Sequence, residues 1–462
     1  MNRARNLLLV LALLPICAGQ PASAYSLLTH EQLIDLTWDD SIVPLLKSQY
    51  PNLTSQQLDR ARSYAYGGCV IQDIGYYPSG DQFFSDLTHY VRTGDFVMAL
   101  FRNAHNANEL AFAIGALSHY VGDSFGHSEA TNRAVAMEFP KLAARYGPSV
   151  NYAEGRHQHV QAEFAFDIDQ IAHHRMAPLR YSRRIGIRVP MRQLTLAFYQ
   201  TYGIRDGFDW RGRQIINRRA YHFATRTFIP RIAYALTLLH RNDEPPEPDT
   251  PDAKLIEAEA AQVDRINNWP AHRRKAGVET HLLAGVIWIL PKVGPLKMLA
   301  VKGPTPQAEA DYMHSVVTST TVLRKTLILF TPIAARAKQT WITTGSTATE
   351  SATLAPLDRS HPLPNRDLDT GQKVKPGGYV LTDTTYAKLL EQLTRKPTQS
   401  IPPGIKRDVA AYYADPDAPI ATKKNSGAWK KVQDELQVLA AMPTSTEPEP
   451  YPTYGEDNPA GD

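Results

Sequence analysis

Cysteine is nearly absent from this chain of 462 residues, which contains only Cys17 and Cys69. Cys17 lies in an N-terminal segment that we expect to be removed, so the remaining protein has one cysteine and no partner for an internal disulfide. A metal site built from several thiolates is disfavoured for the same reason. Stability must therefore come from packing of the hydrophobic residues, which make up 43% of the chain.

The chain also lacks a large net charge and a membrane-spanning hydrophobic run. Its 50 Lys and Arg residues and 46 Asp and Glu residues give a formal charge of +4, which by itself does not indicate nucleic-acid binding. The run Leu7 to Ala18 is shorter than the ~20 residues that cross a bilayer. Two arginines precede it and Ala22-Ser23-Ala24 follows, which is the order of a secretory signal peptide. We predict cleavage after Ala24 and a secreted or periplasmic mature protein that begins at Tyr25; a retained anchor and lipidation at Cys17 are the weaker alternatives.

Helical periodicity dominates the chain from Tyr25 to about Arg241. Hydrophobic residues recur at intervals of three and four, without sustained alternation, so we predict an all-α domain over residues 25–241. The clearest expected helices span residues 31–47, 55–66, 95–104 and 110–128. Glycine and proline clusters predict loops at Gly67-Gly68 and at residues 77–80.

The remainder of the chain is expected to form additional C-terminal helical regions separated by linkers. We predict a linker at 242–272, a helical region with an apolar segment at 273–340, a linker at 341–362, a small helical domain at 363–442 and a disordered tail at 443–462. The apolar segment Leu282 to Leu290 has two interpretations, a buried helix end or a lipid-contacting surface flanked by lysines. None of these regions carries an obvious catalytic motif.

Three metal-ligand residue types recur at steps of four in the run His119, Asp123 and His127. Each such step turns a helix by only about 40°, so the three side chains share one face. Asp123 lies on the apolar side of the expected helix, and a buried carboxylate needs a partner. We interpret the run as part of a metal site.

Further imidazoles and carboxylates surround this run in the N-terminal half. His159 and Glu163 form a second pair at a spacing of four, and Asp73, His89 and His30 complete the candidates. A single histidine or an H-x3-E pair also has an ordinary structural interpretation, as a hydrogen-bonded residue or a helix-face contact. Imidazole and carboxylate ligands favour zinc, and two or three adjacent ions suit the cleavage of a phosphate ester.

With these motifs the sequence resembles the bacterial zinc-dependent phospholipase C family, whose fold is shared with the fungal single-strand-specific nucleases. The resemblance covers about Tyr25 to Tyr202. The matching segments are YSLLTH (25–30), YGGCVIQDIGYYP (66–78), DLTHY (86–90), ALSHYVGDSFGH (116–127) and HVQAEF (159–164).

The resemblance implies three zinc ions and assigns their ligands. The first ion would be held by Asp73, His89, His119 and Asp123, and the second by His127, His159 and Glu163. The third would be held by His30, Asp123 and the free amine and carbonyl of Tyr25, which stands where the family commonly has tryptophan. Asp73 would also accept a proton from the attacking water. His157 is a rival of His159, but only His159 has a carboxylate four residues later.

The implied function is that of a secreted zinc-dependent phosphodiesterase of the phospholipase C type (EC 3.1.4.-, with 3.1.4.3 expected). Its substrate would be phospholipid at a membrane surface, hydrolysed by metal-activated water, and no obligate protein partner is inferred. Substrate-binding residues and the head group are left open, because Ile74 stands where an aromatic residue would help to hold a quaternary ammonium.

Two alternatives remain beside the phospholipase. A zinc nuclease acting on single-stranded nucleic acid needs the same ions, and a basic run offers it phosphate contacts; the run comprises Arg180, Arg183, Arg184, Arg188 and Arg192. Such a run is also typical of a solvated surface. A noncatalytic zinc-binding envelope protein is the third hypothesis, and full coordination of every ion by protein groups would favour it.

Overall fold

The computed structural model describes residues 26–77, 80–204, 222–240, 247–293, 299–330, 363–415 and 419–446. Within these ranges the protein is helical, with two isolated β-bridges and no β-strand. The all-α fold is thus confirmed. The signal peptide, Tyr25, the linker at 341–362 and most of the C-terminal tail lie outside the described residues, so the predictions for them stay predictions.

The N-terminal part consists of short and medium helices in close succession. They are α2 (Leu27–Thr37), π-helical η2 (Trp38–Ile42), α3 (Val43–Gln49), α4 (Ser55–Gly68), 3-10 helix η3 (Gln72–Tyr76), α5 (Gln82–Tyr90), α6 (Thr93–Arg102), α7 (Ala107–Gly126), π-helical η4 (His127–Thr131), α8 (Asn132–Glu138), α9 (Pro140–Tyr146), α10 (Arg156–Ala172), α11 (Leu179–Ile185), α12 (Met191–Tyr202), η5 (Ala224–Phe228) and α14 (Ile229–His240).

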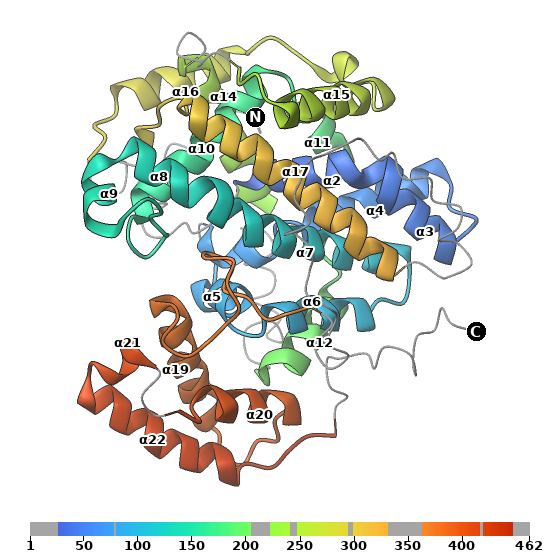
Figure 1. Ribbon diagram of the computed structural model, residues 1–462. Coiled ribbons are helices and arrows are strands. Elements are labelled where there is room, and N and C mark those ends of the chain that lie inside the picture. The colour runs from blue at the N-terminus through green and yellow to red at the C-terminus, as the bar shows by residue number, and fades with distance from the viewer. Residues whose placement is uncertain are drawn as a thin grey trace.

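Helix α7 is the centre of the arrangement, with α2, α4, α6 and α17 packed against it (Figure 1). Asn106 caps its N-terminus by accepting hydrogen bonds from the backbone amides of Asn108 and Glu109. Nearly all later residues of α7 are buried, as expected of a helix that is apolar on every side. At His127 the α-helix passes into the π-helical turn η4, a feature that often marks functional positions in helices.

Helices α4 and α7 approach each other closely through glycine. A Cβ atom at Gly68 would lie 2.0 Å from the carbonyl oxygen of Phe112, and one at Gly115 would lie 2.1 Å from that of Ala65. The loop predicted at Gly67-Gly68 is therefore wrong. Both residues belong to the last turn of α4, where the lack of a side chain lets Gly68 contact α7 and Gly67 contact the backbone of Arg188.

The C-terminal helices pack directly against this N-terminal part. They are α15 (Pro251–Ile266), η6 (Trp269–His272), α16 (Val278–Ile289), α17 (Pro306–Leu329), α19 (Val380–Thr394), α20 (Pro403–Tyr412), α21 (Ile420–Lys423) and α22 (Ser426–Ala441). Helix α17 crosses α7, α16 lies on α14, and α19 contacts α5 (Figure 1). Where a linker was expected, residues 251–266 form α15, whose apolar face packs on α17. The domain boundaries themselves stay predictions.

Among the described residues, no helix is both long enough and apolar enough to cross a membrane.

Candidate metal centre

Five of the predicted ligands meet where α2, η3, α5 and α7 converge. All five side chains are buried, and they come from four helices: His30 from α2, Asp73 from η3, His89 from α5, and His119 and Asp123 from α7. They form two groups of three, and within each group the donor atoms lie within 4.8 Å of one another. The first group is His30, His119 and Asp123, and the second is Asp73, His89 and His119. Both groups include His119.

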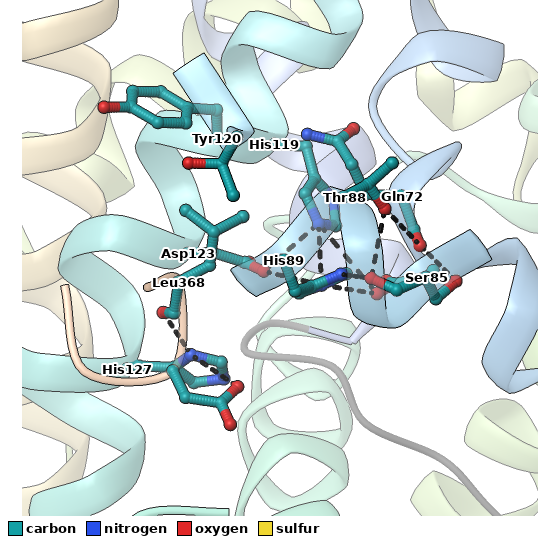
Figure 2. Close-up of polar contacts among 12 residues, drawn as sticks. Gln72, Ser85, Thr88, His89, His119, Tyr120, Asp123, His127 and Leu368 are labelled. Carbon is teal, nitrogen blue, oxygen red and sulfur yellow. Dashed lines mark hydrogen bonds and ion pairs between the residues drawn. The ribbon is translucent and has the colours of Figure 1, made fainter. Parts of the chain in front are cut away.

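Asp123 lies between three imidazoles. Its Oδ1 atom is 3.2 Å from Nε2 of His30. Its Oδ2 atom is 3.1 Å from Nε2 of His119 and 3.4 Å from Nε2 of His89 (Figure 2). On the far side of His89, Oδ1 of Asp73 lies 3.3 Å from the same Nε2 atom. The carboxylate of Asp123 is therefore placed to serve two neighbouring ions, as the sequence resemblance implies.

Backbone carbonyls fix the orientation of these imidazoles. Nδ1 of His89 donates to the carbonyl of Ser85 at 2.8 Å, and Nδ1 of His119 donates to the carbonyl of Cys69 at 2.9 Å. With Nδ1 carrying the proton, each ring presents a lone pair on Nε2 toward the carboxylates. This pairing of a metal-facing nitrogen with a hydrogen-bonded one is the usual arrangement of histidine ligands in metal sites.

The second predicted site forms a neighbouring group of His127, His159 and Glu163, also buried and with donor atoms within 4.8 Å of one another. Nε2 of His159 lies 3.1 Å from Oε1 of Glu163. The rings of His127 and His159 meet edge to face with centroids 4.8 Å apart. The rival His157 is half-buried and belongs to none of the groups found in the described part of the chain.

Electrostatics in the centre favour a bound cation. Burial raises the pKa of the Asp123 carboxyl, but the neighbouring imidazoles, His119 foremost, outweigh it and hold that pKa well below its usual value. Burial, together with Asp73 and Asp123, raises the pKa of Glu163 well above its usual value. Several carboxyl groups thus share one buried region, and a cation bound among them would allow all of them to ionise.

The donor set fits zinc. Its members are imidazole nitrogens and carboxylate oxygens, which zinc accepts readily. Nε2 of His127 is buried and has no hydrogen-bond partner among the described residues, although its Nδ1 is held by a carbonyl. A buried histidine whose Nδ1 is held by a carbonyl and whose Nε2 has no protein hydrogen-bond partner is typical of a metal ligand.

The carbonyl that holds His127 comes from a distant part of the chain. We call residues 363–374 the strap. The carbonyl of Leu368 in the strap accepts from Nδ1 of His127 at 2.6 Å (Figure 2), and the Leu368 amide donates to the carbonyl of His89 at 3.0 Å. One residue of the strap therefore contacts two predicted ligands of different ions.

Asp369, the next residue of the strap, places a buried carboxyl group beside the second group. Its Oδ1 atom lies 3.6 Å from Nδ1 of His127, and its Oδ2 atom accepts hydrogen bonds from the hydroxyls of Tyr90 at 3.0 Å and Tyr379 at 2.5 Å. Sequence reasoning missed both Leu368 and Asp369. The only signal was the turn-forming run from Asp367 to Gly371, which does not specify what the turn contacts.

A fourth group of ligand-type residues lies outside the predicted sites. It comprises Asp169, His173 and Glu309, which join α10 to α17. Nη1 of Arg175 lies 3.9 Å from Asp169 and 3.8 Å from Glu309, so a guanidinium already supplies positive charge between these two carboxyl groups. We interpret this group as an ion-pair network that attaches α17 to the metal-bearing helix.

Residues 29–227 match the family model described as zinc dependent phospholipase C. Comparison with curated proteins and with solved structures gave no match. The matched segment includes every predicted ligand except Tyr25, which precedes it, and it ends well before the strap. Over residues 29–227, the chain is thus similar to the zinc-dependent phospholipase C family, as the sequence motifs imply.

Proposed function

We propose that the protein is a secreted phospholipase C that hydrolyses the phosphodiester of glycerophospholipids to diacylglycerol and a phosphorylated head group (EC 3.1.4.3). The observation that carries this proposal is the convergence of eight predicted ligands, drawn from five separate segments, into adjoining groups inside the family segment. Three zinc ions are proposed, with the amine and carbonyl of Tyr25 completing the third site after signal cleavage.

Zinc held by such ligands lowers the pKa of water toward neutrality and neutralises the charge on phosphate oxygens. The protein's own residues supply position and proton transfer. Asp123, between His30 and His119, fixes the separation of two sites. Asp73 lies at the edge of the first site, 3.3 Å from His89, and we assign to it the second role of proton acceptor for the attacking water.

The nuclease and the noncatalytic protein are less well supported. In the basic run, Arg184 pairs with Asp59 at 2.9 Å and Arg183 is half-buried against the carbonyl of Arg226, as in an ordinary surface network. The noncatalytic hypothesis requires that the protein fill every coordination position. The described residues give the second group only three donors, which leaves room for a water or substrate oxygen.

A substrate panel on the zinc-loaded protein that begins at Tyr25 tests the proposal. The panel comprises vesicles of phosphatidylcholine, phosphatidylethanolamine and phosphatidylglycerol, together with single-stranded DNA. We expect release of diacylglycerol from at least one lipid, and loss of this activity in Asp123→Asn. The matched control is Asp59→Asn, since Asp59 is an exposed carboxylate in a surface ion pair. Cleavage of DNA without lipid hydrolysis would overturn the proposal in favour of a nuclease. Hydrolysis of none of these substrates would overturn it in favour of a noncatalytic zinc-binding protein.

A further inference from the structure

Helix α16 is apolar on two faces. One face carries the buried side chains of Leu283, Ala284 and Ile287 and packs against α14. An ion pair between Glu279 of α16 and Arg231 of α14, 3.2 Å long, strengthens the same contact. The sequence had left open whether the segment Leu282 to Leu290 is a buried helix end or a lipid-contacting surface. On this face of α16 the side chains are buried.

The other face of α16 is exposed. Five large hydrophobic residues, which we call the α16 patch, have high exposed fractions: Val278 85%, Leu282 52%, Trp288 74%, Ile289 75% and Val293 64%. The first four lie on α16 and the fifth just beyond its end. Scattered exposed hydrophobic residues are ordinary on protein surfaces, but a helix that is apolar on its solvent side as well as on its packed side indicates a partner.

Basic residues flank the α16 patch on both sides. Arg274 and Lys275 are exposed before its first residue, and Lys292 precedes its last. Glu279 is the only acidic residue between positions 273 and 293, and it is engaged by Arg231. A second copy of the chain on the same patch would bring these positive charges together. An anionic lipid surface would instead pair with them.

We propose that the α16 patch is the surface by which the protein docks onto phospholipid membranes. The inference rests on the proposed function, because it identifies the surface that brings a phospholipase to aggregated substrate. A tryptophan beside aliphatic residues and flanking lysine or arginine is the composition of segments that lie in the membrane interface. The patch is also connected to the catalytic part, since α16 packs on α14 and α14 packs on α10, which carries His159 and Glu163.

Vesicle binding tests the docking surface separately from catalysis. Mature protein is cosedimented with vesicles of phosphatidylcholine containing phosphatidylglycerol, and compared with the double variant Trp288→Gln/Ile289→Gln. The matched control is Val438→Gln, which changes an exposed valine on α22, at the opposite end of the molecule from α16 (Figure 1). Hydrolysis of a monomeric, water-soluble chromogenic phosphodiester is measured for all three proteins.

We expect the double variant to bind vesicles at least about tenfold more weakly, because two apolar side chains no longer enter the interface. The control should bind like the wild type, and added salt should weaken binding to the anionic vesicles. Trp288→Phe should retain binding and reduce the blue shift of tryptophan emission on vesicle addition, since Trp288 is exposed on the α16 patch whereas Trp38 and Trp269 are buried and Trp429 lies half-buried on α22.

The two proposals fail in different measurements. Equal vesicle binding by the wild type and the double variant, or no binding by the wild type at low salt, would overturn the docking surface. Normal hydrolysis of the soluble phosphodiester by the double variant shows that its metal centre is intact, so weaker vesicle binding then reports on the patch. Absence of phosphodiester hydrolysis in the wild type would overturn the proposed function instead, whatever the vesicles show.

Discussion

Gly371 is the residue through which the strap can be moved without changing any predicted ligand. Its φ angle is +68°, and a Cβ atom there would lie 2.2 Å from the carbonyl oxygen of Ser124, which lies on α7 about one turn before His127. The Ser124 carbonyl cannot move aside easily, because it belongs to the backbone of the central helix α7. Gly371→Ala should therefore push the strap away from α7 and withdraw the Leu368 carbonyl from His127.

The magnitude follows from three contributions. An alanine in the left-handed region costs about 1–2 kcal/mol, and a weakened hydrogen bond from His127 costs about 0.5–1.5 kcal/mol more. Loss of an outer partner of a histidine ligand typically reduces metal affinity by about 10–100-fold. We therefore expect a modest loss of stability together with a selective loss of affinity for one zinc ion, that of the second site.

The assay is a zinc titration against a competing chelator, with thermal unfolding measured on the same samples. Gly147→Ala is the matched control, because Gly147 also has a positive φ angle, +97°, but a Cβ atom there meets nothing within 4 Å. Both variants should lose stability, and only Gly371→Ala should lose zinc affinity. Equal zinc affinity in Gly371→Ala and the wild type would refute the reasoning that the strap positions His127.

Glu309, the N-terminus and Cys69 each allow a further test. Burial and the neighbouring Asp169 raise the pKa of Glu309 to about 8, so the stability that its bound proton provides is complete below about pH 4.5 and is lost as the pH rises through about 8. Glu309→Gln should flatten the fall in melting temperature between about pH 5 and 9, and an unchanged slope would contradict the assignment. Retention of even one residue before Tyr25 should reduce bound zinc and activity, measured on proteins whose N-termini are verified by mass spectrometry; full zinc content in the extended protein would argue against a ligand at the terminus. Cys69→Ala should retain zinc and activity, because the Cys69 backbone carbonyl, not its thiol, holds His119, and a large loss of zinc would show that the side chain matters.

The site could be predicted from sequence where its geometry is local or its motif is specific. The shared face of His119 and Asp123 follows from helical periodicity alone. The assembly of His30, Asp73 and His89 around them depended on the resemblance, because no local rule brings α2, η3 and α5 together. The spacing of His159 and Glu163 favoured His159 over His157, and it is His159 that lies buried beside His127 and Glu163.

Other features could not be read from the sequence for physical reasons. The strap orients His127 through the backbone carbonyl of Leu368, and every residue has a carbonyl, so no residue type marks the role. Gly67 and Gly68 suggested a loop, although they are required by the close backbone of Arg188 and of α7, respectively. The two faces of α16 are both apolar, so periodicity alone could not separate the packed face from the exposed one.

The most direct test of the central claim is the zinc content of the mature protein, measured by elemental analysis on the wild type, Asp123→Asn and Asp59→Asn. The three groups of ligands predict about three zinc ions per chain in the wild type and in Asp59→Asn. Asp123→Asn should retain about one ion, that of His127, His159 and Glu163, because Asp123 joins the other two sites. A wild type without tightly bound zinc, or an Asp123→Asn variant with the full complement, would contradict the account.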